Sequence, residues 1–139
     1  MFFANSGIGP MQGQANVFMR NKLKIPFGVK RYVEETERLY SVLEDGLKAG
    51  GGWLVGGKYS VADINAYTWV STYGTLGIDM AKYPHVLDWL ARISAREGVK
   101  AGLKVPKQRQ LTDNEAAMKN RETVKKFIEE ANKQLEEAQ

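Results

Sequence analysis

The sequence predicts an all-α protein. No stretch of six or more residues alternates apolar and polar side chains, as a half-buried strand would. Several stretches instead repeat apolar residues at intervals of three and four, which is the spacing of one helix face. At 139 residues the chain is long enough for one core and too short for a second sizeable domain. We therefore expect a single bundle of helices.

The first predicted element covers residues 1–21. It is expected to form two helical pieces with a kink between them, because Gly7, Gly9 and Pro10 interrupt an apolar stretch with few charges. No capping residue precedes the apolar residues at the start, although a helix normally supplies one. We therefore expect that a segment upstream of Met1 is missing.

The clearest amphipathic helix spans residues 28–48. Its apolar residues recur at intervals of three and four, and charged side chains fill the positions between them. The run Gly50–Gly52 ends this helix, since three glycines lose too much backbone entropy to stay helical. The run lacks the preceding strand and the GxxxxGK pattern of a phosphate-binding loop, so we interpret it as a turn.

Residues 60–70 form the predicted central helix. Ser60 stands at its N-cap and Asp63 follows three residues later, the spacing of a capping box, while Tyr59 and Ile64 can close a hydrophobic staple. Beyond the cap the helix is apolar nearly all round, so we expect it at the centre of the bundle. No titrating partner for Asp63 is visible, so its predicted role is structural, worth roughly 1 to 2 kcal/mol, rather than catalytic.

Pro84 occupies the first turn of a further predicted helix, and a short helical piece covers residues 99–103. Residues 107–139 differ, because a narrow apolar stripe crosses a surface of Lys and Glu, and Thr112 and Glu115 have the spacing of a second capping box. Such a helix is marginal alone in water. It either packs back onto the bundle or covers a groove on a partner.

Composition excludes several classes of function. The chain has no cysteine, so disulfides, thiolate nucleophiles and zinc–thiolate sites are excluded, and we expect a reducing, cytoplasmic location. The start lacks the pattern of a signal peptide, and no apolar run has the length of a membrane span, so we expect no membrane partner. The net charge of +4 is scattered, so nucleic acid is not expected either. The single histidine, His85, has no second ligand or nucleophile in a suitable motif, and we expect a surface or capping residue with no metal site.

Several short motifs share their order and spacing with one family. They are Phe2-Phe3, Gly9-Pro10-Met11-Gln12-Gly13-Gln14-Ala15, Ile25-Pro26, Arg31-Tyr32, Glu35-Thr36, Arg38-Leu39-Tyr40, Trp53-Leu54-Val55-Gly56-Gly57, the Ser60 capping box and Tyr83-Pro84. Together they resemble the C-terminal helical domain of cytosolic glutathione transferases, and they are similar to the nu class of bacteria and the fungal branch that includes the prion-forming nitrogen regulator. The resemblance covers residues 1–106, and residues 107–139 form a charged amphipathic extension.

The resemblance implies a bundle of about five helices, a homodimer, and an N-terminal thioredoxin-like domain that residues 1–139 lack. In the family that domain supplies most of the glutathione site, and the helical domain supplies walls of the pocket for an apolar second substrate. The resemblance thus implies glutathione as a possible co-substrate, no covalently bound cofactor and no catalytic residue in this chain. Without that domain, an apolar face is left for a partner to cover.

Individual positions carry further implications of the resemblance. Arg31 matches an arginine that contributes to glutathione binding across the dimer, and a guanidinium suits a carboxylate because it offers a paired donor fork. Its alternative role is an ion pair with Glu34 or Glu35 on an exposed helix face. The positions implied to line the apolar-substrate pocket, with the helical core as their alternative place, are Met11, Gln14, Phe18 and Tyr73.

Two functions follow as hypotheses. The chain is either part of a glutathione transferase, to which it contributes the apolar-substrate pocket and a dimer surface, or a non-catalytic module derived from that domain that binds a protein or a small apolar ligand. Nothing in the sequence offers a constellation of donors that would lower the pKa of a glutathione thiol. Activity would therefore depend on the missing domain or on a partner.

Overall fold

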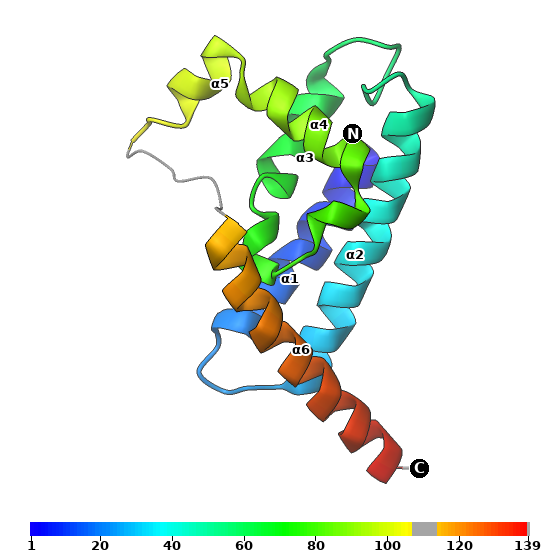
Figure 1. Ribbon diagram of the computed structural model, residues 1–139, viewed down its shortest axis with the longest axis vertical. Helices are drawn as coiled ribbons and strands as arrows, with labels where there is room; N and C mark the ends of the chain where they lie inside the picture. Colours follow the sequence, from blue (N-terminus) through cyan, green and yellow to red (C-terminus); the bar gives the residue numbers. More distant parts are fainter. Residues whose placement is uncertain (107–113, 139) are drawn as a thin grey trace.

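The computed structural model describes residues 1–106 and 114–138, which form helices joined by turns (Figure 1). These residues contain no β-strand, and their one β-bridge pairs Val55 with Lys58. The elements in chain order are η1 (Phe3–Ile8), α1 (Gly9–Arg20), α2 (Pro26–Ala49), α3 (Val61–Val70), η2 (Tyr73–Leu76), η3 (Met80–Lys82), α4 (Pro84–Ser94), α5 (Glu97–Gly102) and α6 (Asn114–Glu137). The prediction of an all-α fold is confirmed, with five α-helices in residues 1–106 and one in the tail.

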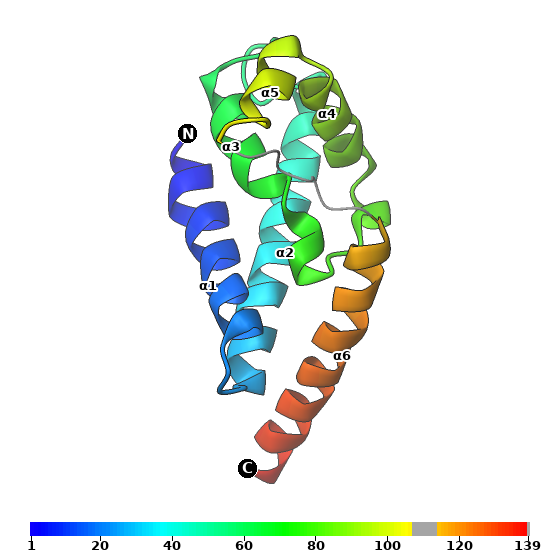
Figure 2. The ribbon, with the colours of Figure 1, turned by 90° about the vertical axis from the view of Figure 1, so that its left-hand side faces the viewer.

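Helix α2 is the central element of the bundle. It runs antiparallel to α1 and packs against α1, α4 and α6 (Figure 2). Pro26 opens the helix, where its missing N–H costs no hydrogen bond. The helix buries one face along its whole length, and this face is made of Pro26, Gly28, Val29, Val33, Thr36, Leu39, Tyr40, Leu43 and Leu47.

The start of the chain differs from the predicted kink. Residues 3–20 stay helical throughout, and the irregularity is the π-helical segment η1, in which the Gly9 N–H donates to the Ala4 carbonyl. Pro10 follows directly and has no N–H to donate. The wider turn therefore absorbs the proline without a break in the helix.

The glycine run after α2 forms a turn, as interpreted from the sequence. Gly51 and Gly52 have φ angles of 65° and 87°, a region in which side chains are strained. The guanidinium of Arg92 donates to the Gly52 carbonyl at 2.6 Å, and a Cβ at Gly52 would lie 2.5 Å from its Nη2. The glycines therefore let an arginine of α4 hold the turn from the side.

Helix α3 begins with a capping box. Ser60 Oγ accepts from the Ala62 N–H at 3.3 Å, and Asp63 Oδ2 accepts from the Ser60 N–H at 2.8 Å. The apolar sequence of α3 predicts a helix that is buried on all sides. The structure differs from this prediction, because Ile64 is 48% exposed and Trp69 is 37% exposed. Periodicity cannot find the outer face of a helix whose faces are equally apolar. The staple between Tyr59 and Ile64 stays a prediction.

Asp63 does more than cap its own helix. Its side chain is completely buried, and Oδ1 accepts from the Trp89 indole N–H at 2.9 Å and from the Leu54 N–H at 3.1 Å. Ser60 Oγ also donates to Oδ2, at 2.8 Å. One carboxylate thereby joins α3, the preceding loop and α4 by four hydrogen bonds, which satisfies a group that would be costly to bury alone.

Helix α4 is capped from α2. Both oxygens of Glu44 accept backbone N–H groups, from His85 at 3.0 Å and from Val86 at 2.9 Å, and Oε1 also contacts Nδ1 of the His85 ring. Burial by itself would raise the pKa of Glu44, but the hydrogen bonds from His85 and Val86 outweigh it and lower that pKa. His85 therefore takes part in a cap on the protein surface.

The tail helix packs back onto the bundle. Helix α6 lies against α2 and η2, and its buried residues Ala117, Val124 and Ala131 recur at intervals of seven (Figure 2). Of the two alternatives left by the sequence, the helix therefore packs back onto the bundle, although Leu135 at the far end of its apolar stripe stays 40% exposed. The predicted capping box of Thr112 and Glu115 lies outside the described side chains.

We expect Asp63→Ala to lower the free energy of unfolding by about 3 kcal/mol, because it leaves buried donors of three segments without an acceptor. Urea denaturation measures this change. Asp45→Ala is the control, since Asp45 is exposed on α2, and its effect should stay within about 0.5 kcal/mol. Equal effects of the two substitutions would contradict the role given to Asp63.

Candidate functional site

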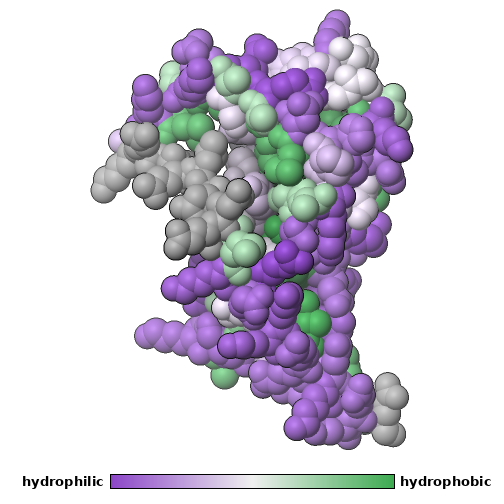
Figure 3. Space-filling view, in the orientation of Figure 1, coloured by the Kyte–Doolittle hydropathy of each residue, from purple (hydrophilic) through white to green (hydrophobic). Residues whose placement is uncertain are grey.

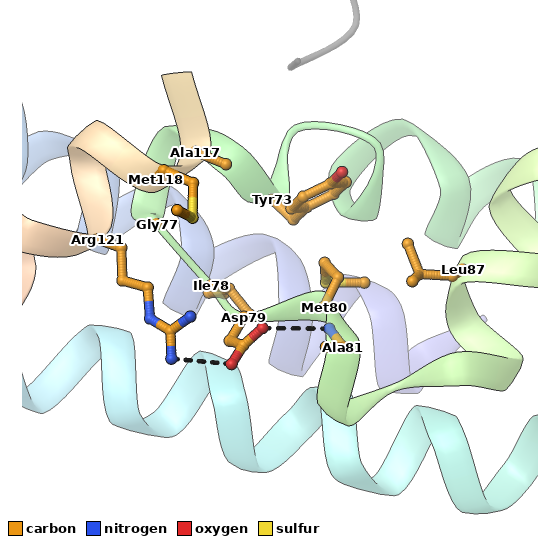
Figure 4. Close-up of a pocket in the computed structure, with 10 residues that line it drawn as sticks. All are labelled: Tyr73, Gly77, Ile78, Asp79, Met80, Ala81, Leu87, Ala117, Met118 and Arg121. Carbon is orange, nitrogen blue, oxygen red and sulfur yellow. Dashed lines mark hydrogen bonds and ion pairs between the residues drawn. The ribbon is translucent and has the colours of Figure 1, made fainter. Parts of the chain in front are cut away.

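A cleft of about 390 Å³ opens between the start of α6, the segment 73–81 and α4 (Figure 4). Its wall is mostly apolar, and the residues that line it are Tyr73, Gly77, Ile78, Asp79, Met80, Ala81, Leu87, Ala117, Met118 and Arg121. Three of these residues come from the tail helix, so the cleft exists only because α6 docks there. On the face of the molecule in Figure 3, green apolar residues are partly enclosed by hydrophilic ones.

The two charged residues of the cleft neutralise each other. Arg121 Nη2 lies 2.8 Å from Asp79 Oδ2, and Asp79 Oδ1 accepts from the Ala81 N–H at 3.2 Å (Figure 4). The same carboxylate therefore starts the short helix η3 and holds α6. The remaining lining offers apolar surface and two methionines, a combination suited to an uncharged apolar ligand.

Helix α6 approaches the segment 74–77 unusually closely. Gly77 has a φ of 64°, and a Cβ at this position would lie 2.3 Å from the backbone nitrogen of Arg121. Next to it, the Asn120 amide donates to the Gly74 carbonyl at 2.9 Å. The missing side chain of Gly77 therefore sets the position of the wall that α6 contributes.

The four residues that the resemblance places in one pocket lie on α1 and on η2, which contact each other. Tyr73 lines the cleft, whereas Met11, Gln14 and Phe18 lie on α1 and do not line it. The three α1 residues share one stripe by their spacing of three and four. Met11 and Phe18 are half-buried against the core and Gln14 is exposed. Whether this stripe lines a second pocket wall stays a prediction.

Phe18 is held by a close contact with α2. Its ring stacks on Tyr32 with 5.4 Å between the ring centroids, and a Cβ at Gly28 would lie 2.4 Å from Phe18 Cδ1. Gly28 therefore provides the space for the aromatic ring between the two helices.

Arg31 is exposed on α2 and forms no ion pair with any described residue. The two glutamates considered as its partners are engaged elsewhere, Glu34 with Lys30 and Glu35 with Arg38 at 2.8 Å. Hydrogen bonding from Arg38 lowers the pKa of Glu35, and the charge of Arg31 is a smaller contribution in the same direction. The guanidinium of Arg31 thus keeps its donor fork available.

Sequence reasoning missed a buried glutamine that joins three elements. The Gln12 amide donates to the Trp69 carbonyl at 2.8 Å and to Thr72 Oγ1 at 3.0 Å, and its oxygen accepts from the Tyr40 hydroxyl at 3.0 Å. The signal was available, because Gln12 falls on the stripe of Ile8 and Ala15 that faces the core. A polar residue on such a stripe needs hydrogen-bond partners.

The tyrosines near Gln12 extend from this junction toward the cleft. Burial raises the pKa of Tyr40 strongly, and the nearby phenols of Tyr83 and Tyr73 raise it further. The hydrogen bond from Tyr40 to Gln12 lowers this pKa, but by less. Burial also raises the pKa of Tyr83, whose hydroxyl donates to the Glu37 carbonyl at 3.1 Å. The Tyr40 hydroxyl therefore stays a neutral donor. Through Gln12, which accepts from Tyr40 and donates to Thr72, it helps to hold α1, α2 and the start of η2 together.

The described residues contain no group of three or more His, Asp or Glu side chains placed to hold a metal ion. None of the helices in residues 1–106 and 114–138 combines the length and the apolar character that crossing a bilayer requires. What the cleft offers is a shaped apolar surface with one ion pair at its edge.

Residues 28–97 match the family model of the glutathione S-transferase C-terminal domain. This match spans half of the chain, so the protein belongs to the glutathione S-transferase family and contains its C-terminal helical domain. The identification agrees with the resemblance drawn from the motifs.

Several relatives and solved structures are similar to this chain over part of their length. It is 41% identical over 97 residues to the disulfide-bond oxidoreductase YfcG of Escherichia coli, covering 69% of this chain and 45% of the relative. A glutathione transferase homolog from Lodderomyces elongisporus, solved with two glutathione molecules per subunit, superposes with a TM-score of 0.72 at 35% identity over 76% of this chain and 50% of that one. The nitrogen regulation fragment of the yeast prion protein Ure2p superposes with a TM-score of 0.70 at 32% identity, over 75% and 51%. The chain spans about half the length of the curated relatives it matches.

We expect Gly28→Ala to destabilise the fold by about 2 kcal/mol, because its methyl group would overlap the Phe18 ring. Gly46→Ala is the matched control on the same helix, since a Cβ there meets nothing within 4 Å, and it should be neutral or stabilising by up to about 1 kcal/mol. Thermal and urea unfolding of both variants measure the difference. Similar unfolding energies would show that Phe18 moves freely.

Gly77→Ala should loosen α6 and cost about 3 kcal/mol, from backbone strain and from overlap with the backbone of Arg121. Gly57→Ala isolates the strain, because Gly57 has a φ of 65° and open space around it, and it should cost only about 1 kcal/mol. Limited proteolysis within α6 should increase for the first variant alone. Protection of α6 in Gly77→Ala would contradict the close approach.

Proposed function

We propose that this chain supplies the helical half of a glutathione-dependent transferase. In this role it contributes walls of the pocket for an apolar second substrate and one surface of a dimer, and glutathione is the co-substrate. No constellation of donors that would lower the pKa of a thiol is evident among the described residues, so we infer that a thioredoxin-like domain or a partner provides that chemistry.

The observation that carries this proposal is the exposure of large apolar side chains at the start of the chain and on α3. The segment η1 is adjacent to α3, with the Asn65 amide donating to Asn5 Oδ1 at 3.0 Å. Phe2, which precedes η1, is 88% exposed, and Ile64 and Trp69 of α3 are 48% and 37% exposed. Exposed apolar side chains in such number favour a contact with another domain or chain. The matched part makes up only about half of each relative, 45% and 52%, which supports a second domain as the cover.

Arg31 is the residue proposed to bind glutathione. It is exposed and unpaired among the described residues, as a carboxylate-binding arginine must be before its ligand arrives. Glutathione carries two carboxylates, each of which can accept two parallel N–H donors from a guanidinium. Solved relatives with glutathione bound support the same ligand.

A second function is favoured by the cleft itself. A volume of about 390 Å³ with apolar walls is large enough for a small ligand, and the chain forms it without another domain. In this alternative the protein is a non-catalytic module that binds a small apolar compound or a protein.

The test is a chimera in which this chain replaces the aligned portion of the E. coli relative. If the transferase role holds, the chimera binds glutathione and turns it over, and Arg31→Ala weakens glutathione binding roughly tenfold through the loss of a charged hydrogen bond. Calorimetry and initial rates at varied glutathione measure both effects.

Arg38→Ala is the matched control, since Arg38 is exposed on the same helix and already paired with Glu35. It should leave glutathione binding unchanged. A chimera that melts cooperatively but shows no glutathione-dependent turnover would contradict the transferase role. Binding of an apolar fluorescent dye by the isolated chain in that case would favour the second function.

A further inference from the structure

A second, open groove lies between the start of α3 and helix α5, at the end of the molecule opposite the C-terminus of α6 (Figures 1 and 2). Its volume is about 750 Å³, it is shallow and open to solvent, and most of its wall is apolar. Its lining includes Tyr59, Ile64, Arg96, Glu97, Gly98 and Val99. The cleft at Tyr73 shares none of these residues, so the groove is a separate surface.

Tyr59 forms a fixed platform at one side of this groove. The next residue, Ser60, donates its N–H to Asp63 Oδ2 at 2.8 Å, and Leu54 donates its N–H to Oδ1 at 3.1 Å. One buried carboxylate thus holds the loop before α3 at both of its ends. The Trp53 ring meets the Tyr59 ring edge to face, with 5.6 Å between the ring centroids. The backbone beside Tyr59 and its ring are therefore both held in place.

The guanidinium of Arg96 stacks on this platform. Its Cζ lies 3.8 Å from the centroid of the Tyr59 ring, which is a cation–π contact. Arg92 of α4 stacks on Trp53 in the same manner at 4.4 Å, and its Nη2 also donates to the Gly52 carbonyl at 2.6 Å. Arg92 therefore has a structural acceptor for its donors.

The donors of Arg96 have no such acceptor. Its guanidinium takes part in no hydrogen bond or ion pair among the described residues. The neighbouring carboxylate of Glu97 instead pairs with Lys100 at 2.8 Å. Because stacking fixes the plane of the Arg96 guanidinium, its fork of N–H groups is pre-organised for a planar anion before one binds.

The surroundings of Arg96 favour a single carboxylate as this anion. Arg96 is the one cation among the residues that line the groove, whereas nucleic acids are held by several cations. A carboxylate carries one charge and accepts two parallel hydrogen bonds from the fork. Beside it, Ile64 is 48% exposed and Val99 is half-buried. The complementary ligand therefore has a carboxylate next to a large apolar group.

We propose that this groove binds an acidic, apolar segment of a partner protein. An aspartate or glutamate side chain of the partner lies on Arg96, and an adjacent large apolar side chain lies on Ile64 and Val99. The occupant is a chain segment because the groove is open along one side, whereas pockets for small ligands enclose most of the ligand surface. This inference gives a surface and a partner chemistry to the protein-binding alternative above. It needs neither glutathione nor the cleft at Tyr73, so it holds or fails independently of the transferase role.

The probe is a display library of random peptides, selected against the whole chain in the absence of glutathione. The selected peptides should be enriched in Asp or Glu beside Leu, Ile or Phe, and should bind with a Kd below about 1 mM. Titration of the isotope-labelled chain, followed by NMR, should shift the amides of residues 59–64 and 95–99. No enrichment of such sequences, or shifts confined to other residues, would overturn the proposal.

Arg96→Gln should weaken the binding of a selected peptide roughly tenfold, through the loss of a charged hydrogen bond. Arg20→Gln is the matched control and should bind like the wild type. It removes the same charge from an exposed arginine at the end of α1, which lies at the opposite end of the molecule from α5 (Figure 1).

A peptide with an amide in place of its acid should bind the wild type roughly tenfold more weakly than the acidic peptide does. Against Arg96→Gln the two peptides should bind equally, because the group that distinguishes them is gone. The same loss against both proteins would show that another cation holds the carboxylate, and the proposal would be wrong.

Gly98→Leu tests the apolar part of the groove. A Cβ at Gly98 meets nothing within 4 Å, so the leucine occupies the groove without disturbing the packing and should weaken peptide binding tenfold or more. Gly102→Leu is the matched control on α5, because a Cβ there is equally free and Gly102 does not line the groove. Circular dichroism melting checks the fold of every variant. Unchanged binding by a folded Gly98→Leu variant would contradict the proposed surface.

Discussion

The arrangement of α3, α4 and the loop before α3 depends on the buried carboxylate of Asp63. A charge without solvent must have its hydrogen bonds, and Asp63 obtains four from Leu54, Ser60 and Trp89. These donors belong to a loop, a helix start and a different helix, so the carboxylate fixes three segments at once. The indole of Trp89 is fully buried and has its N–H satisfied only in this arrangement. Asp63 thus joins α3 to α4, together with the hydrogen bond between the Tyr67 and Ser94 hydroxyls at 2.9 Å.

Around α1, the segment 73–81 and α6, the residues that fix the packing are Gln12 and Gly77. Gln12 connects α1, α2 and the end of α3 through its amide, and Gly77 admits α6 at backbone distance. The cleft at Tyr73 depends on both residues. Gln12 holds Thr72, where the segment 73–81 begins, and Gly77 sets how closely α6 approaches as the opposite wall. Small changes far from the cleft lining would therefore reshape it, because protein interiors are close-packed.

The surface differs in polarity from one element to the next. Large apolar side chains before η1 and on α3 stay exposed, whereas α6 packs its apolar stripe against α2 and η2 and presents charged side chains to water. The chain belongs to the glutathione S-transferase family and spans about half the length of its curated relatives. Among the described residues, large apolar side chains are exposed before η1 and on α3, Arg31 forms no ion pair, and the cleft lining is mostly apolar.

The sequence alone determined the helical class, the amphipathic α2, the cap at Ser60 and the docking stripe of the tail, because these depend on local spacing and on side chains within one turn. The sequence could not identify the outer face of α3, since all sides of that helix are similarly apolar. Gln12, Glu44 and Arg121 were also beyond it, because their partners Tyr40, Val86 and Asp79 lie 28 to 42 residues away. Tertiary structure decided these positions, since only the folded chain brings distant donors and acceptors to hydrogen-bonding distance.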